Sequence, residues 1–598
     1  MRRRSAFAVL TLVAASVAAA TGCQLVVGPF GIGADGGAPE GAAGDGGLQA
    51  DGSSDAPTLG DAPVGTDADG LAPNDAGAEA SSEPAPRPVA PLSSSRVTSR
   101  TPTLHWVLVS GIPDATVDLC SSRECAQPIQ SSHVTGSSFT PAALSPGIVY
   151  WRLHPGTSTT STSPTWQFVV GARSAPIDAS GGTVLDVNGD HFADVAVGAP
   201  GENKVYLYMG GGSGLPPKPA VTLVGQGGAF GGSVASAGDV DGDGYADLIV
   251  GAAGTGNSAG TVYVYRGGPG GLSDAPSATI ASPLGDDGSF GTSVAGVGDV
   301  DGDGYADILV GASGPGAGSN PGAVILFRGG PAGPVTPGTI IPSPGGTSAP
   351  HGFGVQVAGA GDVNSDGFAD IAVGVSGNPV GVAGTYVFMG GPNGASATPQ
   401  ILDAGAAFSL AGVGDINGDG YADLVTGAPG DSASGTPGTI FVYAGGANGL
   451  PQTPTKVNAP QSASSFGQAV AGAGDVNGDG YEDVVVGVPQ DSTVAPSGGK
   501  AYVYLGGTNY ITSASAIAVA GSPQANGFFG TAVSSAGDVD YDGNSDVIIG
   551  APGVQQNTGS ASLFPGSQSG PATTAISTLP GPDGHGWHFG ASLFGSTN

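Results

Sequence analysis

The feature that most constrains the fold is a short acidic segment that recurs seven times in the last 425 of the chain's 598 residues. It is clearest as GDVDGDGYADLIVGA at 238–252, and its first aspartate returns at intervals of 53, 60, 63, 53, 60 and 63 residues. A period of about 59 residues is in the range of one β-propeller blade with long loops. A single unit cannot bury its own apolar faces, so we expect the units to stack around a ring.

Each unit contains four short segments in a constant order. A Phe-Gly pair, as at Phe230-Gly231, opens the unit, and a strand of small residues leads into the acidic segment. A buried-type strand, a glycine-rich turn, an aromatic strand such as 262–265 and a poorer fourth strand complete it. Because the chain has 112 glycines and 48 prolines, helices have little place in this pattern. The sequence therefore predicts an all-β, seven-bladed β-propeller over residues 174–598.

The end of the chain repeats the start of a unit. The first unit lacks an obvious Phe-Gly start, whereas His588-Phe589-Gly590 has one and no acidic segment follows it. We therefore predict that residues 588–598 supply the innermost strand of the first blade. Such closure removes two exposed sheet edges, which would otherwise invite aggregation.

The acidic segments are predicted to be metal sites, most simply for calcium. Each places three or four aspartates within nine residues, and these charges would repel one another unless a cation held them. Alternating hard oxygen donors suit calcium, and a glycine at the sixth position permits the sharp turn. An EF-hand would need a glutamate at position twelve, where Val250 stands in the second repeat. The alternative is a set of polar turns that bind no metal.

The sequence thus predicts up to seven calcium ions with structural roles. The expected ligands are Asp186, Asn188, Asp190 and Asp194; Asp239, Asp241, Asp243 and Asp247; Asp299, Asp301, Asp303 and Asp307; Asp362, Asn364, Asp366 and Asp370; Asp415, Asn417, Asp419 and Asp423; Asp475, Asn477, Asp479 and Asp483; and Asp538, Asp540, Asp542 and Asp546.

The Phe-Gly start, the acidic loop and a following Gly-Ala-Pro, as at 198–200 and 427–429, together resemble FG-GAP repeats. FG-GAP repeats build the seven-bladed propeller of integrin α subunits and of many bacterial surface proteins. The first unit departs from the pattern at His191, which replaces the loop glycine. The resemblance implies a calcium-stabilised binding or adhesion module that engages protein or glycan partners through its inter-blade loops.

The first 23 residues are predicted to export and anchor the protein. Arg2–Arg4 precede an apolar stretch, Ala6–Ala20, that is too short to span a bilayer. The sequence Ala20-Thr21-Gly22-Cys23 resembles a lipoprotein lipobox, which implies a lipid on Cys23. An ordinary signal peptide with an incidental cysteine is the alternative. We expect an exported protein held at the bacterial cell envelope, at the outer membrane or cell surface, with the lipid as its one membrane contact.

Residues 24–95 are predicted to be a disordered acidic tether. They are rich in Gly, Ala, Asp, Ser and Pro, with almost no large apolar side chain after Phe30. Such a segment cannot bury enough surface to offset its ordering entropy, and its like charges extend it. We expect it to hold the folded part away from the membrane.

Residues 96–173 are predicted to form a small immunoglobulin- or fibronectin-III-like β-sandwich. Strand-like runs occur at Thr103–Val109, Ala115–Leu119, Ile148–Leu153 and Trp166–Val170, separated by Pro, Gly and Ser clusters.

The two remaining cysteines lie in this predicted module. Cys120 and Cys125 are five residues apart, which favours a disulfide, as expected outside the cytoplasm. Two thiols are too few ligands for a structural zinc site.

The net charge and the sequence motifs exclude some classes of function for this chain. With a net charge of −33 and no basic patch, nucleic acid is excluded as a partner. GNSAG at 256–260 matches the GxSxG nucleophile motif, but it lies in an expected hairpin with no helix after it. The aspartates could act as acid–base pairs, but the repeated ligand pattern already explains them. We therefore expect a monomeric binding protein that is not an enzyme. The alternative is a hydrolase or lyase acting on extracellular polysaccharide, with the propeller as its scaffold.

Overall fold

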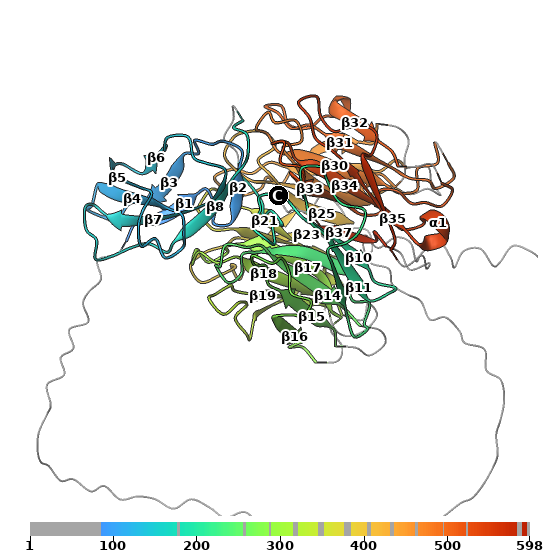
Figure 1. Cartoon of the computed structure of the whole chain (residues 1–598), viewed down its shortest axis with the longest axis horizontal. Coiled ribbons are helices and arrows are strands. Elements are labelled where there is room, and N and C mark those ends of the chain that lie inside the picture. Colours follow the sequence, from blue (N-terminus) through green and yellow to red (C-terminus); the bar gives the residue numbers. More distant parts are fainter. Residues whose placement is uncertain are drawn as a thin grey trace, which may run out of the picture. The chain divides into compact units, whose positions relative to one another are not determined.

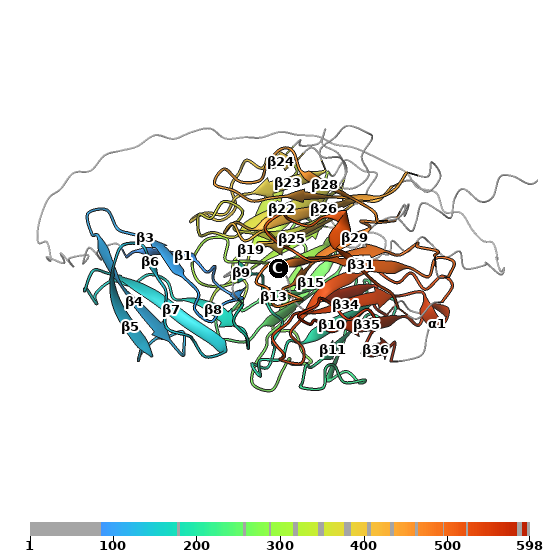
Figure 2. The same cartoon turned by 90° about the horizontal axis from the view of Figure 1, so that it is seen from above.

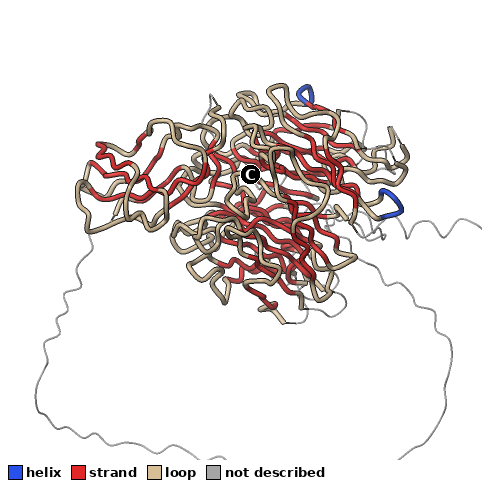
Figure 3. The backbone as a smooth tube through the Cα atoms, viewed as in Figure 1, coloured by secondary structure: helices blue, strands red, loops and turns tan. Residues whose placement is uncertain are grey.

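Strands form nearly all the regular structure of the described residues (Figure 3). The computed structural model describes residues 85–175, 180–254, 259–285, 289–314, 321–344, 352–375, 384–402, 408–430, 436–460, 465–493, 495–521, 524–582 and 589–594. Its helices are a 3-10 turn at Ser513–Ser515 and the four-residue α1 (Val554–Asn557). Within the described part of the chain, no helix has the length and apolar character needed to cross a membrane. The predicted export signal, Cys23 and the tether up to residue 84 lie outside the described residues.

The N-terminal module is a sandwich of two sheets. One sheet has the order β1 (Arg87–Ala90), β3 (Leu104–Val107), β6 (Ser138–Phe139), and the other has the order β5 (Gln130–Thr135), β4 (Asp114–Cys120), β7 (Gly147–Pro155), β8 (Trp166–Val170), β2 (Ser95–Val97), β9 (Ser180–Gly181). Trp106, Trp151 and Trp166 are buried in the shared core. The sequence thus predicted the sandwich and located most of its main strands.

The sandwich extends beyond the predicted residues 96–173 at both ends. Its first strand, β1, lies in the segment that the sequence assigned to the tether, and β9 lies beyond residue 173. β1 pairs with β3 through Arg87 and Val107. It is an edge strand, where proline costs no ladder hydrogen bond, so a proline-rich composition did not reveal it.

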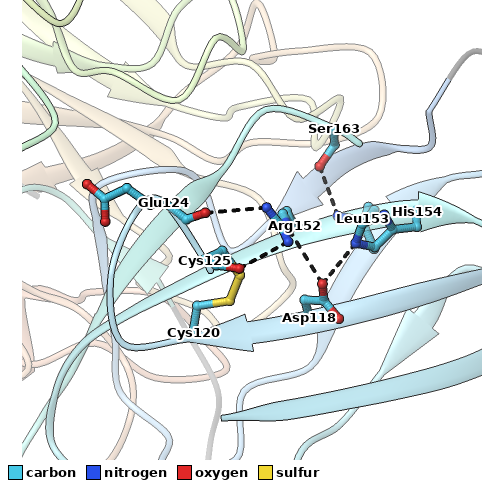
Figure 4. Close-up of a disulfide and its surroundings, with 8 residues drawn as sticks. All are labelled: Asp118, Cys120, Glu124, Cys125, Arg152, Leu153, His154 and Ser163. Atoms are coloured by element: carbon cyan, nitrogen blue, oxygen red, sulfur yellow. Dashed lines mark hydrogen bonds and ion pairs between the residues drawn. A yellow bond between two sulfur atoms is a disulfide. The ribbon is translucent and has the colours of Figure 1, made fainter. Parts of the chain in front are cut away.

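A disulfide joins Cys120 and Cys125, whose Cα atoms are 5.3 Å apart, and closes the turn after β4 (Figure 4). The guanidinium of Arg152 donates to the Cys125 carbonyl at 3.1 Å. Buried Asp118 lies between Arg152 and His154, with its Oδ2 2.8 Å from His154 Nε2. Asp118 and His154 can therefore be buried, because they pair with each other across strands β4 and β7 and Asp118 also pairs with Arg152.

The propeller consists of seven four-stranded antiparallel sheets, one for each repeat (Figure 1). The first strands of neighbouring blades contact one another around the ring, so they form its inner wall. From the inner to the outer strand, the blades are: blade 1, β37 (Ser592–Phe594), β10 (Val195–Ala199), β11 (Lys204–Tyr208), β12 (Val221–Val224); blade 2, β13 (Ser233–Gly238), β14 (Asp247–Ala252), β15 (Thr261–Tyr265), β16 (Ala278–Ala281); blade 3, β17 (Phe290–Gly298), β18 (Asp307–Ala312), β19 (Ala323–Phe327), β20 (Thr339–Pro342); blade 4, β21 (Phe353–Gly361), β22 (Asp370–Val375), β23 (Thr385–Phe388), β24 (Gln400–Leu402); blade 5, β25 (Ser409–Gly414), β26 (Asp423–Ala428), β27 (Thr439–Tyr443), β28 (Thr455–Asn458); blade 6, β29 (Ala469–Gly474), β30 (Asp483–Val488), β31 (Lys500–Tyr504), β32 (Ala516–Val519); and blade 7, β33 (Val533–Gly537), β34 (Asp546–Ala551), β35 (Ser560–Phe564), β36 (Ser577–Pro580).

The segment Phe589–Phe594 closes the ring, which confirms the prediction for these residues; His588 and residues 595–598 lie outside the described residues. β37 pairs with β10, with Val197 opposite Leu593, and contacts both β13 and β33. Blades 1 and 7 lie side by side in Figure 2 and share one hydrophobic core, which includes Phe589. Closure therefore covers the edge of β10 that would otherwise be free.

The Phe-Gly pairs hold adjacent blades together. The phenyl rings of Phe290 and its equivalents are buried, and the following Gly291 has a φ of 85°, which side-chain-bearing residues rarely adopt. A Cβ on Gly251, in the Gly-Ala of the preceding blade, would lie 2.2 Å from the Gly291 carbonyl oxygen. The backbones of two blades thus meet at a point where neither residue can carry a side chain.

Candidate metal sites

Each acidic segment immediately precedes or begins the second strand of its blade, so the seven segments recur at the same point of every sheet. We number them loops 1 to 7 and count nine positions in each. They span residues 186–194, 239–247, 299–307, 362–370, 415–423, 475–483 and 538–546. In loop 2, position 1 directly follows β13 and position 9 is the first residue of β14.

Side-chain oxygens shape each loop by accepting backbone hydrogen bonds. In loop 2 the carboxylate of Asp239 accepts the N–H groups of Asp243 at 3.0 Å and Gly244 at 2.9 Å. The carboxylate of Asp243 accepts the N–H of Tyr245 at 3.0 Å. In the other loops too, the N–H at position 6 donates to the carboxylate at position 1, and the N–H at position 7 donates to the carboxylate at position 5. The loop is therefore folded so that its acidic side chains turn inward, toward one another.

The aspartate at position 9 ties the loop to the rest of its blade. Asp247 is fully buried, and its two oxygens accept the N–H of Val240 at 3.0 Å and the N–H of Gly267 at 2.9 Å. Val240 follows the first strand and Gly267 follows the third, so this carboxylate connects the ends of two strands at the same edge of the blade. Its equivalents make the same pair of bonds: Asp194, Asp307, Asp370, Asp423, Asp483 and Asp546.

Backbone hydrogen bonds also connect the seven loops to one another. The N–H at position 8 donates to the carbonyl at position 1 of the preceding loop, as from Ala246 to Asp186 at 3.0 Å. The series ends with Ala193 donating to Asp538 at 3.0 Å, which joins loop 1 to loop 7. The loops thus form a closed ring, and the position of each depends on its neighbour.

The donors fit a hard divalent cation. In loops 2, 3 and 7, one carboxylate oxygen from each of three aspartates lies within 4.8 Å of the others. These groups are Asp239, Asp241 and Asp247; Asp299, Asp301 and Asp303; and Asp538, Asp540 and Asp542. In the other four loops position 3 is asparagine, whose amide donates to the aspartate at position 5, as from Asn364 to Asp366 at 3.0 Å. Carboxylate and amide oxygens with a flexible geometry suit calcium.

Sequence comparison identifies the repeats. The FG-GAP-like repeat profile matches residues 186–250 and 239–310, and the FG-GAP repeat profile matches 407–443, 466–504 and 529–564. The chain carries FG-GAP repeats. It is 36% identical to Xenopus laevis integrin alpha-4 over 141 residues, which is 23% of this chain and 13% of the integrin. It is 33% identical to Mus musculus integrin alpha-IIb over 193 residues, which is 26% of this chain and 18% of the integrin.

The matched region is thus less than one-fifth of these integrin chains. Among solved structures, a Lactobacillus plantarum protein has a TM-score of 0.40 at 11% identity, covering 67% of this chain and 98% of its own. The Dos1 propeller has a TM-score of 0.31 at 12% identity, covering 69% and 84% respectively.

Burial makes the FG-GAP loop carboxylates costly to ionise without a cation. It raises the pKa of Asp194 and Asp423 to about 8 and that of Asp362 to about 7, although backbone N–H groups partly oppose the shift. Burial also raises the pKa of Asp243 to about 6, and nearby Asp241 and Asp239 raise it further. A bound divalent ion would stabilise the ionised form of these groups, so their environment favours a cation.

The sandwich and the propeller belong to one compact unit, and sandwich side chains reach the FG-GAP loops. The Gln167 amide donates to Asp239 at 2.9 Å. The guanidinium of Arg123 donates to the Gly304 carbonyl at 2.6 Å and lies 4.3 Å from the ring centre of Tyr305. Sequence reasoning missed these contacts, because the repeat pattern carries no information about a partner outside the repeats.

The structure also brings two arginines of the propeller into the loops. Arg266 Nε lies 2.9 Å from Asp241 Oδ2, and Arg328 Nη1 lies 2.9 Å from Asp301 Oδ2. Both aspartates occupy position 3. The signal was present in the sequence, because each arginine directly follows the aromatic third strand of its repeat.

Proposed function

We propose that the protein is a calcium-stabilised binding module, displayed at the bacterial cell surface, that engages a protein or glycan partner through the loops between its blades. The observation that carries the proposal is the closed ring of seven loops, each with three or four aspartates in the same hydrogen-bonded geometry. FG-GAP repeats and the similarity to integrin α chains support a binding role over a catalytic one. Calcium would brace the loops and so present the inter-blade surface in one rigid arrangement.

Display would follow from the N-terminal segment. A lipid on Cys23 would anchor the chain, and the acidic residues up to the sandwich would separate the propeller from the membrane. Metabolic labelling with a palmitate analogue tests this part. Label retained by the full chain and lost in Cys23→Ser supports it, and equal labelling of the two contradicts it.

One cavity beside the loops has carboxylates that all belong to the FG-GAP repeats. This cavity of about 590 Å³ is lined by Asp362, Asp415 and Asp419, together with Tyr421 and His105. All three carboxylates are FG-GAP loop residues, whose hydrogen bonds already account for them. The space is large enough for a small ligand such as a sugar, which agrees with binding.

Two measurements test the proposal. The melting temperature of the full chain should fall in chelator and recover when calcium is added back, and an identical melt in both conditions contradicts calcium binding. A glycan and protein array, probed with and without calcium, should then show calcium-dependent retention. Turnover of an arrayed glycan would favour the enzyme instead.

A further inference from the structure

The residue that directly follows the third strand occupies equivalent places in the blades. Arg266 of blade 2 lies against Gly333 of blade 3, and the side chains of Met209 and Met389 lie against the matching glycines of the next blades. We call this place the slot. Through the seven repeats the slot residues are Met209, Arg266, Arg328, Met389, Ala444, Leu505 and Pro565. The slot therefore accepts an apolar side chain, and packing does not require an arginine there.

The slot residue varies together with position 3 of the loop. Arginine occurs in blades 2 and 3, where position 3 is Asp241 or Asp301. In loops 1, 4, 5 and 6 position 3 is asparagine and the slot residue is uncharged. Positions 1, 5 and 9 are aspartate in every loop, so each of loops 1 to 5 has a net side-chain charge of −3 once its slot residue is counted. Loop 6 also has Glu482 at position 8, which gives it a charge of −4.

Loop 7 combines Asp540 with Pro565 in the slot. There a different arginine approaches: Arg96 of the sandwich donates to Ser545 at 2.7 Å, and its charge opposes the rise in the pKa of Asp538. Arg123 of the sandwich likewise lies near loops 2 and 3, where its charge opposes the rise in the pKa of Asp239 and Asp303. The effect of a slot arginine is therefore measured by changing that residue alone.

We propose that Arg266 and Arg328 are counter-ions that lower the calcium affinity of loops 2 and 3 toward that of the asparagine loops 1, 4 and 5, which have the same net charge. This inference rests on the proposed calcium binding. Each guanidinium holds one oxygen of the position-3 carboxylate, so an entering cation meets both a partly occupied donor and a like charge. The Asp241 side chain is only 6% exposed, so solvent screens this pair weakly.

Four states of loop 2 test the proposal in the full chain. The native loop has a net charge of −3, Arg266→Met has −4, Asp241→Asn has −2, and the double variant returns to −3 with the Asn-and-Met pattern of blades 1 and 4. Hydrogen exchange of the peptide that contains Asp243 and Gly244 is measured against calcium chloride concentration, because both amides bond to Asp239. The calcium concentration at half-maximal protection is compared among the four states.

We expect that midpoint to fall about tenfold in Arg266→Met and to rise about tenfold in Asp241→Asn, while the double variant stays near the native value. Arg328→Met should have the same effect on the loop 3 peptide and none on loop 2. Lys456→Met, which removes a positive charge from the outer strand β28, is the control for net charge and should shift neither loop.

The outcomes separate this inference from the proposed function. If calcium protects the loops but the loop 2 midpoint is the same in all four states, or rises in Arg266→Met, the counter-ion role is wrong while calcium binding stands. If calcium protects no loop in any variant, the proposed function itself fails. If Arg266→Met unfolds, Arg328→Met provides the same comparison in loop 3.

Discussion

The buried phenyl ring of Phe589 offers a sharp test of how the ring is closed. Its side chain is 1% exposed and packs edge-to-face on Tyr206 and Tyr208, with ring centres 5.6 and 6.5 Å apart. Removing a buried phenyl ring costs about 3–5 kcal/mol of unfolding free energy. The edge-to-face pairs contribute about 0.5–1.5 kcal/mol of that loss. Phe589→Ala should therefore lower the free energy of unfolding by about 3–5 kcal/mol.

Blade 4 provides a matched control within the same chain. Phe353 is fully buried and packs on Tyr386 and Phe388 at 5.5 and 6.3 Å, nearly the same geometry. Urea denaturation of Phe589→Ala and Phe353→Ala, at one fixed calcium concentration, should give equal losses within about 1 kcal/mol. A full loss in Phe353→Ala with none in Phe589→Ala would show that the end of the chain does not close the ring.

Three further predictions follow from the closure, the loop carboxylates and the blade contacts. Deleting residues 588–598 should lower the melting temperature sharply, because β10 loses its inner partner; an unchanged melt in calorimetry would contradict the closure. In chelator, the free energy of unfolding should decrease as pH rises from about 4 to about 8, because burial raises the folded-state pKa of Asp194 from 3.8 to about 8. Calcium should abolish that slope, since it keeps these carboxylates ionised in the folded state as they are in the unfolded state, and urea titrations at pH 5 and pH 8 measure the slope in both conditions. Gly251→Ala should cost more than about 2 kcal/mol by its clash with Gly291, whereas Gly211→Ala, with open space around it, should be nearly neutral in the same assay.

Most of the fold could be predicted from the repeat period, because the four strands of each blade come from one continuous stretch of sequence in six of the seven repeats. The seven sheets, their four strands and the closing role of Phe589 could all be predicted from spacing and from the Phe-Gly pairs. The composition of Arg87–Ala90 pointed to a linker, since proline is rare inside sheets but harmless on an edge strand. Strand pairing across the sandwich supplied the information that composition lacked.

The candidate sites were predictable only in part. The positions of the aspartates and their suitability for binding a cation could be predicted, because acidic residues at alternate positions beside a turn glycine form a local sequence pattern. The contact of Gln167 with Asp239 was not predicted, because the two residues lie in different domains that meet only in the folded chain. The contact of Arg266 with Asp241 was overlooked although both residues belong to the same repeat.

The pairing of β37 with β10 has a consequence for how the molecule is made. β37 begins at Ser592 and β10 at Val195, so every other strand of the ring is synthesised between them. Until β37 has been synthesised, β10 has no partner strand on its inner side. Joining segments so distant is slow, because the intervening chain has to be arranged first. The ring can therefore close only after the last blade has been synthesised.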